Sequence, residues 1–408
     1  MIEIKPEIAF RKSCEECDHP LENKDLIWQG AHICVVADCQ QCQQTFVLDL
    51  PVAQSILSAS QIKSDAHQLA VKPERNLLYH NLLLEIVKNP QQKKINIQIE
   101  ERKRKEEVII LNCIDFIFGH AILSLLNLQN ILNGCGEKGV IIITQPFLKW
   151  LIPNDERITE VWTVDIKMSE VKAYYEDLTH QINRELKRFK QVHLSKTHLQ
   201  PKEVDIELFT QVKPYDFDAP PTQPRITYIW REDPPRLWYT NYLIYGALKV
   251  TGLAKILMIP HYFRILILFY LLKRKYGNQY RYSLAGMGSK MKFPAFIEDC
   301  RVSQFNTENE IKMCQVYAES VLVIGIHGSS MILPSAHSGM VLNLMPTSKW
   351  RNYIEDILYR EKDVRLASFQ RRIIPVKAGL LEIFKICKNM LTERAYFYKK
   401  FIYAKEEL

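Results

Sequence analysis

The sequence predicts an α/β protein with two Rossmann-like, doubly wound domains that face a cleft, preceded by a zinc-ribbon-like segment. Three observations predict it. Short β-branched apolar runs alternate with amphipathic segments, which is typical of parallel sheets covered by helices. Four prolines between Pro214 and Pro224 divide this alternation into two halves, and two C-x-x-C pairs stand near the N-terminus. We expect a zinc-ribbon-like module over 1–55, domains over 56–213 and 225–378, and a terminal helix over 379–408.

The length and composition exclude several classes of protein. The chain has 408 residues, which suffices for two or three domains of about 150 residues. Its 47% hydrophobic and 25% charged residues exclude a collagenous, disordered or small disulfide-stapled protein. The formal net charge of +8 is compatible with anionic substrates, nucleic acid or an acidic membrane surface, and selects none of them.

The N-terminal segment carries a candidate metal site. Its two C-x-x-C pairs, with 21 residues between them, consist of Cys14, Cys17, Cys39 and Cys42. Two thiolates on each of two tight turns complete a closed tetrahedral site, which predicts a structural zinc. Further candidate ligands are Cys34, His19 and His32. A chance cluster of reduced cysteines is the alternative. Because so short a segment buries little apolar surface, metal binding would supply its folding energy.

The expected elements follow in order. In the first half we expect strands over 108–113, 140–144 and 160–166 and helices over 120–132, 147–152 and 169–192. In the second half we expect strands over 225–230, 280–285, 301–305, 321–326 and 341–345. Helices are expected there over 239–276, 307–319 and 331–336, with a basic helix from Gly379 onward.

The richest candidate site follows the strand over 321–326. It consists of His327, Gly328, Ser329 and Ser330, which lead directly into a helix. Ligands collect at the carboxyl edge of such a sheet, Gly328 permits close backbone approach, and the helix start favours a phosphate. His327 could add a hydrogen bond or a positive charge. The alternative is structural: a serine caps the helix and His327 bonds a neighbouring loop.

Two further segments place polar side chains at strand ends. Arg231, directly after the strand over 225–230, could clamp a diphosphate, or it could pair with Glu232 or Asp233 at the surface. His120, behind Gly119 at a helix start, could act as a base toward a hydroxyl, and Asp115 is a competing candidate for that role. A structural hydrogen bond is the alternative for His120.

The N-terminus and the longest apolar stretch bear on location. Residues 1–11 show no secretory signal, so we expect a cytoplasmic protein with reduced cysteines. The stretch over 254–272 is interrupted by Lys255, Pro260, His261 and Arg264, and falls short of a spanning helix. Its basic end at 273–275 allows peripheral contact with the inner face of a membrane. A buried helix with an exposed basic end is the alternative.

Three segments together resemble glycosyltransferase family 61 and its bacterial relatives. They are Phe118-Gly119-His120, Trp230-Arg231-Glu232-Asp233, and Gly325-Ile326-His327-Gly328-Ser329-Ser330 with its continuation Val341-Leu342-Asn343-Leu344-Met345-Pro346. The likeness spans roughly residues 108–359. It implies a GT-B fold with an amino-terminal acceptor domain, a carboxyl-terminal nucleotide-sugar domain and transfer without a catalytic metal, so that positive groups neutralise the leaving diphosphate.

The resemblance has two departures. Relatives often carry a glutamate where this chain has Asn343, which could contact the donor but is no carboxylate. The zinc-ribbon-like segment also lies outside the family pattern and could be a docking module.

The sequence therefore predicts a glycosyltransferase that moves a sugar from a nucleotide-diphosphate donor to a glycan, lipid-linked or protein hydroxyl. The donor would be bound by Arg231, His327 to Ser330 and Asn343, and His120 or Asp115 would serve as base. The alternative is a non-enzymatic binding protein, either an inactive nucleotide-sugar fold or a nucleic-acid adaptor. Nucleic acid is the less favoured partner, because the aromatic residues near the C-terminus have the spacing of a helix-packing face.

Overall fold

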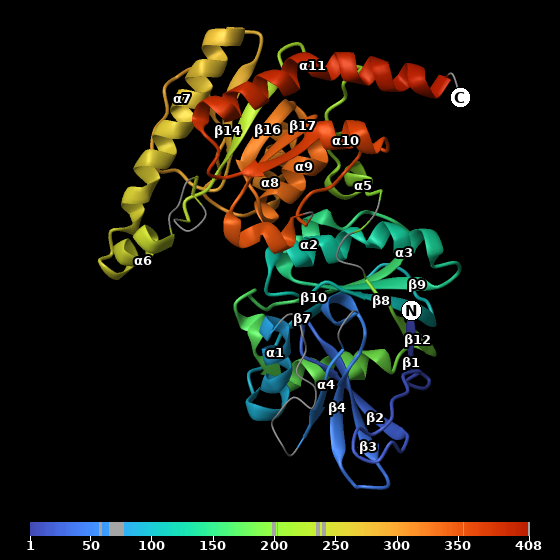
Figure 1. Cartoon of the computed structure of the whole chain (residues 1–408). Helices are drawn as coiled ribbons and strands as arrows, with labels where there is room; N and C mark the ends of the chain where they lie inside the picture. Colours follow the sequence, from blue (N-terminus) through green and yellow to red (C-terminus); the bar gives the residue numbers. More distant parts are fainter. Residues whose placement is uncertain are drawn as a thin grey trace. The chain divides into compact units, whose positions relative to one another are not determined.

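The chain folds into two compact units, Met1–Val204 and Asp205–Leu408 (Figure 1). The computed structural model describes residues 1–56, 59–64, 77–197, 201, 203–233, 237–238, 242–353 and 355–406. The division between the units precedes the expected proline-rich break. The Tyr215 amide donates to the His337 carbonyl at 2.7 Å, and the Tyr215 side chain lies in the core of the second unit. The segment that carries the prolines is therefore part of the second unit.

The first unit is built on a six-stranded sheet. Its strands, in spatial order, are β1 (Ile2–Lys5), β12 (Gln191–Leu194), β8 (Glu107–Asn112), β9 (Gly139–Thr144), β10 (Ile158–Val164) and β7 (Ile97–Glu101). The four central strands are parallel, and β1 and β7 are antiparallel edges. The expected strands over 108–113, 140–144 and 160–166 are thereby confirmed within two residues. Their apolar residues are continuous because both faces of a parallel sheet are covered.

The helices of the first unit differ from expectation in two places. They are α1 (Leu77–Lys88), α2 (Phe118–Leu126), α3 (Leu128–Gly134) and α4 (Glu176–Leu186), with short 3-10 turns at Ala53–Ser55, Pro146–Leu151 and Glu170–Lys172. The single helix over 120–132 is divided at Asn127, whose side chain donates to the Leu123 carbonyl. A helix over 169–192 is wrong. This segment forms β11 (Tyr174–Tyr175) beside β6 (Pro90–Gln91), then α4 and β12, because Val192 and Leu194 are buried at the two-residue spacing of a strand.

The N-terminal segment is built into the first unit. Besides β1, it forms an antiparallel sheet of β2 (Leu21–Trp28), β3 (Ile33–Cys39), β4 (Thr45–Asp49) and β5 (Gln61–Lys63). The backbone amide of Trp28 donates to Thr179 Oγ1 of α4 at 2.9 Å, and Asn112 donates to the Gly30 carbonyl at 2.6 Å. One hydrophobic core includes this sheet, α4 and the central sheet. The region expected as a zinc-ribbon-like module over 1–55 therefore shares the core of the domain that follows it.

The second unit has a fully parallel sheet of Rossmann order. Its strands, in spatial order, are β15 (Ile297–Asp299), β14 (Arg281–Gly286), β13 (Arg225–Trp230), β16 (Ser320–Ile326), β17 (Met340–Met345) and β18 (Arg371–Pro375). Numbered along the chain, this order is 3-2-1-4-5-6. The connection reverses direction between β13 and β16, and ligands of such sheets bind outside the carboxyl ends of the strands at that switch point.

Helices cover both faces of this sheet. They are α5 (Ile206–Thr210), α6 (Tyr242–Val250), α7 (Met258–Tyr276), α8 (Thr307–Ala318), α9 (Ile332–His337), α10 (Val364–Gln370) and α11 (Leu380–Glu406), with short 3-10 turns at Ala254–Leu257, Ser329–Met331 and Thr347–Asn352. Apolar residues of α7 and α11 share a core with one face of β13, β16 and β17 (Figure 1). Helix α8 contacts β13, β14 and β16, and α9 contacts β17.

The predicted strand over 301–305 is wrong. The edge strand is β15, and Arg301 instead lies over the Trp230 ring, 5.0 Å from its centroid. The start of the expected helix over 239–276 lies partly outside the described residues, and from Tyr242 this segment forms α6, the turn at 254–257 and α7.

Candidate functional site

The first candidate site lies at the carboxyl end of β8. The loop after this strand carries Asp115, and α2, which begins at Phe118, carries His120. The loop is held in place at Asp115, whose backbone amide donates to Gln145 Oε1 at 3.1 Å. Asp115 Oδ1 in turn accepts from the Ile117 amide at 2.8 Å. The sheet order changes direction between β8 and β12, so this loop lies at the switch point of the first unit.

Tyr79 of α1 joins the two predicted catalytic residues. Its hydroxyl lies 2.9 Å from both carboxylate oxygens of Asp115 and 2.5 Å from Nδ1 of His120. The direct separation of His120 Nδ1 from Asp115 Oδ2 is longer, at 3.9 Å. Tyr79 therefore connects the imidazole to the carboxylate.

The single hydroxyl proton of Tyr79 can be donated either to Asp115 or to His120 Nδ1. Above about pH 7, where Asp115 is ionised, its carboxylate can only accept, so the Tyr79 hydroxyl donates its proton to Asp115. Its oxygen then accepts from His120, which requires a proton on Nδ1 and leaves Nε2 unprotonated in the neutral ring. This is the tautomer that a general base needs, and it is set by a hydrogen bond to the other ring nitrogen.

Burial moves the pKa of the Asp115 carboxyl to near neutral pH. Asp115 is 5% exposed, and burial raises its pKa from 3.8 to about 7. The hydrogen bonds from the Ile117 amide and the Tyr79 hydroxyl oppose that rise. The His120 side chain is 21% exposed, so it is the member of the group that reaches solvent. Perturbed carboxyls beside a partly exposed histidine are typical of acid–base sites.

A buried ion pair supports Tyr79 from behind. His32 Nδ1 lies 3.1 Å from both oxygens of Asp49, and Nε2 lies 2.9 Å from the Tyr79 carbonyl. Both of these partners accept, so both ring nitrogens carry protons and His32 is an imidazolium. Burial opposes this charge, but the Asp49 carboxylate outweighs burial and raises the pKa of His32. The pair fixes the backbone of α1 at Tyr79.

The second candidate site lies at the switch point of the second unit. Arg231 follows β13 and pairs with Asp233 through Nε at 2.8 Å and Nη2 at 3.1 Å. Its third nitrogen, Nη1, donates to Ser330 Oγ at 3.0 Å, after β16. The alternative of a pairing with a nearby carboxylate is therefore present, and the guanidinium also reaches the serine segment.

The segment after β16 is held open to backbone approach at Gly328. Its φ of +148° is one that L side chains rarely adopt, and a Cβ there would lie 3.7 Å from Arg231 Nη1. Neither serine caps a helix: the 3-10 turn from Ser329 begins at Gly328 without a side-chain cap, and α9 has only six residues. The expected helix-start contribution is therefore weak, and the polar groups of Arg231, Ser329 and Ser330 remain.

His327 and Asn343 lie inward of this segment. His327 Nε2 bonds the Asn352 carbonyl at 2.9 Å, which confirms the neighbouring-loop alternative for this ring. Burial lowers the pKa of His327, while the hydrogen bond to the Asn352 carbonyl opposes that shift. Among the described residues, His327 Nδ1 and both side-chain polar atoms of the fully buried Asn343 have no hydrogen-bond partner. Such buried polar atoms cost free energy unless a further group satisfies them.

The predicted residues thus fall into two sets. Asp115 and His120 lie together in the first unit. Arg231, Gly328 and Ser330 lie together in the second unit, with His327 and Asn343 beneath them.

The four predicted metal ligands form one cluster. The sulfurs of Cys14, Cys17, Cys39 and Cys42 all lie within 4.8 Å of one another. The Cys14–Cys42 separation is 3.5 Å and the Cys17–Cys39 separation is 3.4 Å. Four sulfurs at about 2.3 Å from a tetrahedral zinc lie roughly 3.8 Å apart, so the cluster could hold that ion.

The backbone around the cluster repeats the same turn twice. Asp18 and Gln43, the residues directly after each C-x-x-C pair, have φ values of +56° and +53°. Two of the three spare ligands lie elsewhere: His32 is paired with Asp49, and Cys34 is buried with its sulfur directed at Asp49 Oδ1, 3.9 Å away. The third, His19, accepts from the Cys14 amide through its backbone carbonyl at 2.8 Å and is not among the clustered ligand atoms. The ligand set is therefore the four paired cysteines.

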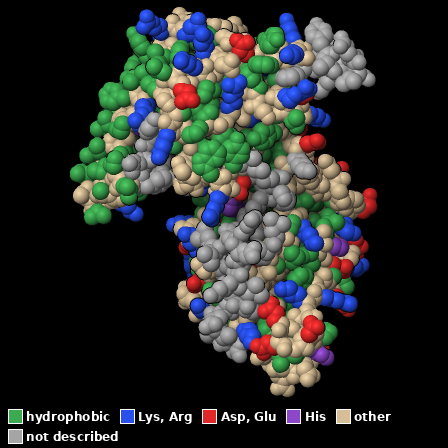
Figure 2. All heavy atoms as spheres, in the orientation of Figure 1, with side chains coloured by type: hydrophobic (Ala, Val, Ile, Leu, Met, Phe, Trp, Pro, Cys, Tyr) green, Lys and Arg blue, Asp and Glu red, His purple; other side chains and the backbone are tan. Residues whose placement is uncertain are grey.

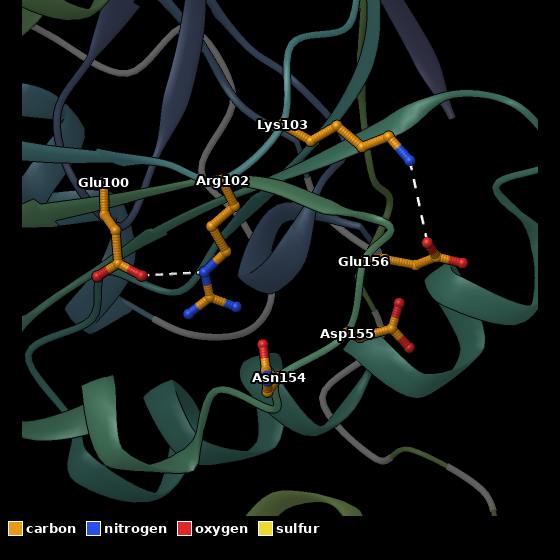
Figure 3. A pocket seen from close by; sticks show the side chains of 6 residues that line it. All are labelled: Glu100, Arg102, Lys103, Asn154, Asp155 and Glu156. Atoms are coloured by element: carbon orange, nitrogen blue, oxygen red, sulfur yellow. Dashed lines mark hydrogen bonds and ion pairs between the residues drawn. The ribbon is translucent and has the colours of Figure 1, made fainter.

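A hollow on the surface of the first unit carries no comparable chemistry. It has a volume of about 500 Å³ and is lined by Glu100, Arg102, Lys103, Asn154, Asp155 and Glu156 (Figure 3). Its charges pair with one another or with neighbours: Arg102 bonds Glu100 at 2.9 Å, and Lys103 lies 3.9 Å from Glu156. This compensation is typical of a solvated surface.

Comparisons with known proteins return one likeness of low similarity. No protein-family model matches the chain, and no curated protein matches it. Among solved structures, E. coli ADP-heptose lps heptosyltransferase II is similar with a TM-score of 0.39 and 8% identity, over 71% of this chain and 99% of that one. An identity and a TM-score this low establish neither a common fold nor a common activity. The resemblance to glycosyltransferase family 61 stays a prediction.

Two residues of the first site were missed by sequence reasoning. Tyr79 comes from a helix 36 residues before Asp115, and no local motif marks it. His32 was considered only as a spare metal ligand. The signal that could have found both is chemical: a buried aspartate and a histidine after a strand require hydrogen-bond partners from elsewhere.

Replacing Asp115 by Asn tests the raised pKa. The folded protein holds Asp115 protonated up to about pH 7, whereas the unfolded chain ionises near 3.8, so ionisation costs folding free energy increasingly between those values. Asp115→Asn removes this cost. We expect the free energy of unfolding of Asp115→Asn, relative to that of the wild type, to rise from about pH 4 to 7 and to stay constant above, by on the order of a few kcal/mol at most.

Asp155→Asn is the matched control, because the hydrogen bond from Arg157 lowers the pKa of Asp155. This exchange should instead destabilise the protein once the pH exceeds about 4. If the difference in free energy of unfolding between Asp115→Asn and the wild type does not change with pH, the raised pKa of Asp115 is contradicted.

Proposed function

We propose that the chain is a glycosyltransferase that moves a sugar from a nucleotide-diphosphate donor to a hydroxyl acceptor. The observation that carries this proposal is the Asp115–Tyr79–His120 group, whose hydrogen bonds support His120 as a general base when Asp115 is ionised. The three-segment resemblance to glycosyltransferase family 61 supports the choice of reaction. The acceptor would be a glycan, a lipid-linked sugar or a protein hydroxyl.

In this reaction His120 Nε2 takes the proton of the acceptor hydroxyl as its oxygen attacks the anomeric carbon. The bond between that carbon and the diphosphate oxygen breaks, and the diphosphate leaves with the electron pair. The imidazolium that forms donates through Nδ1 to Tyr79, which donates to Asp115, so the carboxylate stabilises the new charge across one hydroxyl. Asp115 is thus a positioning and electrostatic residue, and His120 is the base.

The donor would bind in the second unit, outside the carboxyl ends of β13 and β16. Arg231 supplies a planar cation with nitrogens suited to a diphosphate, and Ser329, Ser330 and the Gly328 backbone supply polar groups beside it. An incoming diphosphate competes with Asp233 for the guanidinium. These positive and polar groups would neutralise the leaving group without a divalent ion. The unpartnered atoms of His327 and Asn343 would complete hydrogen bonds in the loaded site.

Thermal unfolding with a set of nucleoside diphosphates tests the donor site, and turnover of the matching nucleotide sugars tests the base. We expect one diphosphate to raise the unfolding midpoint of the wild type, since a ligand of the folded state stabilises it. Arg231→Ala should abolish that rise. His120→Ala should keep the rise and lower transfer or donor hydrolysis by about 10²–10⁴-fold. Tyr79→Phe should lower the rate of transfer or donor hydrolysis less than His120→Ala does.

The control is Arg365→Ala, since Arg365 also pairs with an aspartate two residues away but at an exposed position on α10. It should keep both the rise and the turnover. Absence of any effect of a nucleotide on the wild type would contradict the proposal. Salt-sensitive retention on nucleic acid in its place would favour the adaptor alternative.

We also propose that Cys14, Cys17, Cys39 and Cys42 bind a structural zinc. The sulfur–sulfur separations support tetrahedral ligation without an open position, as in structural sites. When bound, the ion would tie the turn before β2 to the turn between β3 and β4. The ligands would act only in folding, since the thiolates occupy all four positions.

Metal analysis of the freshly purified full chain tests this site. We expect about one equivalent of zinc, and a lower unfolding midpoint after treatment with a chelator. Cys17→Ser should lose the zinc without opening a cavity, because Cys17 is exposed. Cys300→Ser, away from the cluster, should retain it. A wild-type protein without zinc, or full zinc retention by Cys17→Ser, would remove the site.

A further inference from the structure

Helix α7 and the turn before it have an apolar surface on two opposite sides. Residues Ala254–Tyr276 are long and apolar enough to cross a membrane by length and composition. On one side, four residues of α7 with no exposed surface pack into the core of the second unit: Ile265, Leu268, Phe269 and Leu272. These contacts pack the helix against the second unit, whereas a membrane-spanning helix would be surrounded by lipid.

The opposite side of this helix is apolar and exposed. Its members, which we name the outer α7 stripe, are Ile256, Ile259, Phe263, Ile267 and Tyr270. They recur at intervals of three or four residues and so fall on one face within about 80° of arc, at about 100° per residue. Phe263 is 52% exposed and Tyr270 is 62% exposed. The adjacent α6 adds Leu243, Ile244 and Val250, and Figure 2 shows hydrophobic side chains gathered over this part of the molecule.

The charges in the stretch of sequence that contains the outer α7 stripe have one sign. From residue 234 to residue 297 the sequence contains no Asp or Glu and ten Lys or Arg. Lys255 lies beside one end of the outer α7 stripe, and Arg274 and Lys275 lie beyond the other, all of them exposed. Exposed apolar side chains flanked by cations of one sign are typical of helices that lie in the interface of an anionic membrane.

We propose that the outer α7 stripe docks α7 and α6 onto the surface of a bilayer that contains anionic lipids. The helix would lie in the plane of the interface with its inner side still in the core, its apolar stripe entering the acyl boundary and its basic residues meeting the headgroups. The continuous absence of acidic residues over 64 positions favours a bilayer, whose negative charge is spread along the whole surface. This inference stands independently of the proposed transferase activity.

Flotation of the full-length protein with vesicles tests the proposal. We expect the wild type to float with phosphatidylcholine vesicles that contain phosphatidylglycerol, to float less at high salt, and to stay in the bottom fraction with pure phosphatidylcholine. Two triple variants separate the contributions: Ile259→Gln with Phe263→Gln and Ile267→Gln, and Lys255→Gln with Arg274→Gln and Lys275→Gln. Each should lower the bound fraction at least about tenfold.

Val364→Gln is the matched control, because Val364 is an exposed apolar residue of the same unit on α10. It should float like the wild type. If the apolar triple variant does not fold, the charge variant still decides, since its three side chains are exposed. A wild type that ignores anionic vesicles would overturn the proposal. Normal flotation of the apolar triple variant would also overturn it. A third contradicting result would be a wild-type dimer that the apolar triple variant dissociates, with no form of the protein binding vesicles.

Discussion

A carboxylate held out of water at the end of β8 is the constraint on which the first site depends. Burial of Asp115 raises its pKa, and the cost of its charge is reduced by the Ile117 amide and the Tyr79 hydroxyl, which donate to it, and by the nearby charge of His32. Because Tyr79 has one proton to give, the same bond decides which nitrogen of His120 carries hydrogen. In the proposed reaction, Tyr79 would both stabilise the buried carboxylate and orient the base.

The N-terminal segment helps to position Tyr79, on which the first site depends. His32, directly before β3, and Asp49, at the end of β4, form the buried ion pair that holds the carbonyl of Tyr79. The cysteine cluster joins the turn before β2 to the turn after β3, at the end of this strand pair that lies away from His32. A domain expected to act as a separate docking module is thus connected to the candidate base by a continuous core and a hydrogen-bonded chain. A metal there would stabilise the sheet that presents His32.

Much of the fold and part of the candidate site could be predicted from the sequence, for physical reasons that differ between elements. Buried parallel strands need unbroken apolar runs, so β8, β9, β13, β16 and β17 were predictable, as was the cysteine cluster from its spacing. Asp115 and His120 are close together because they share one strand end. Tyr79 and His32 come from distant segments, and only tertiary packing brings them there. The apolar residues of α7 predicted a helix, but which of its sides is exposed depends on where α11 and the sheet lie.

Histidine-selective nitrogen NMR of the full chain measures the central claim directly, because it reports which ring nitrogen is protonated. Near pH 8 we predict His120 with a proton on Nδ1 and none on Nε2, His32 with protons on both nitrogens, and a mixture of tautomers for His120 once Tyr79 is replaced by Phe. A His120 ring protonated at Nε2 and bare at Nδ1 in the wild-type protein would contradict the account.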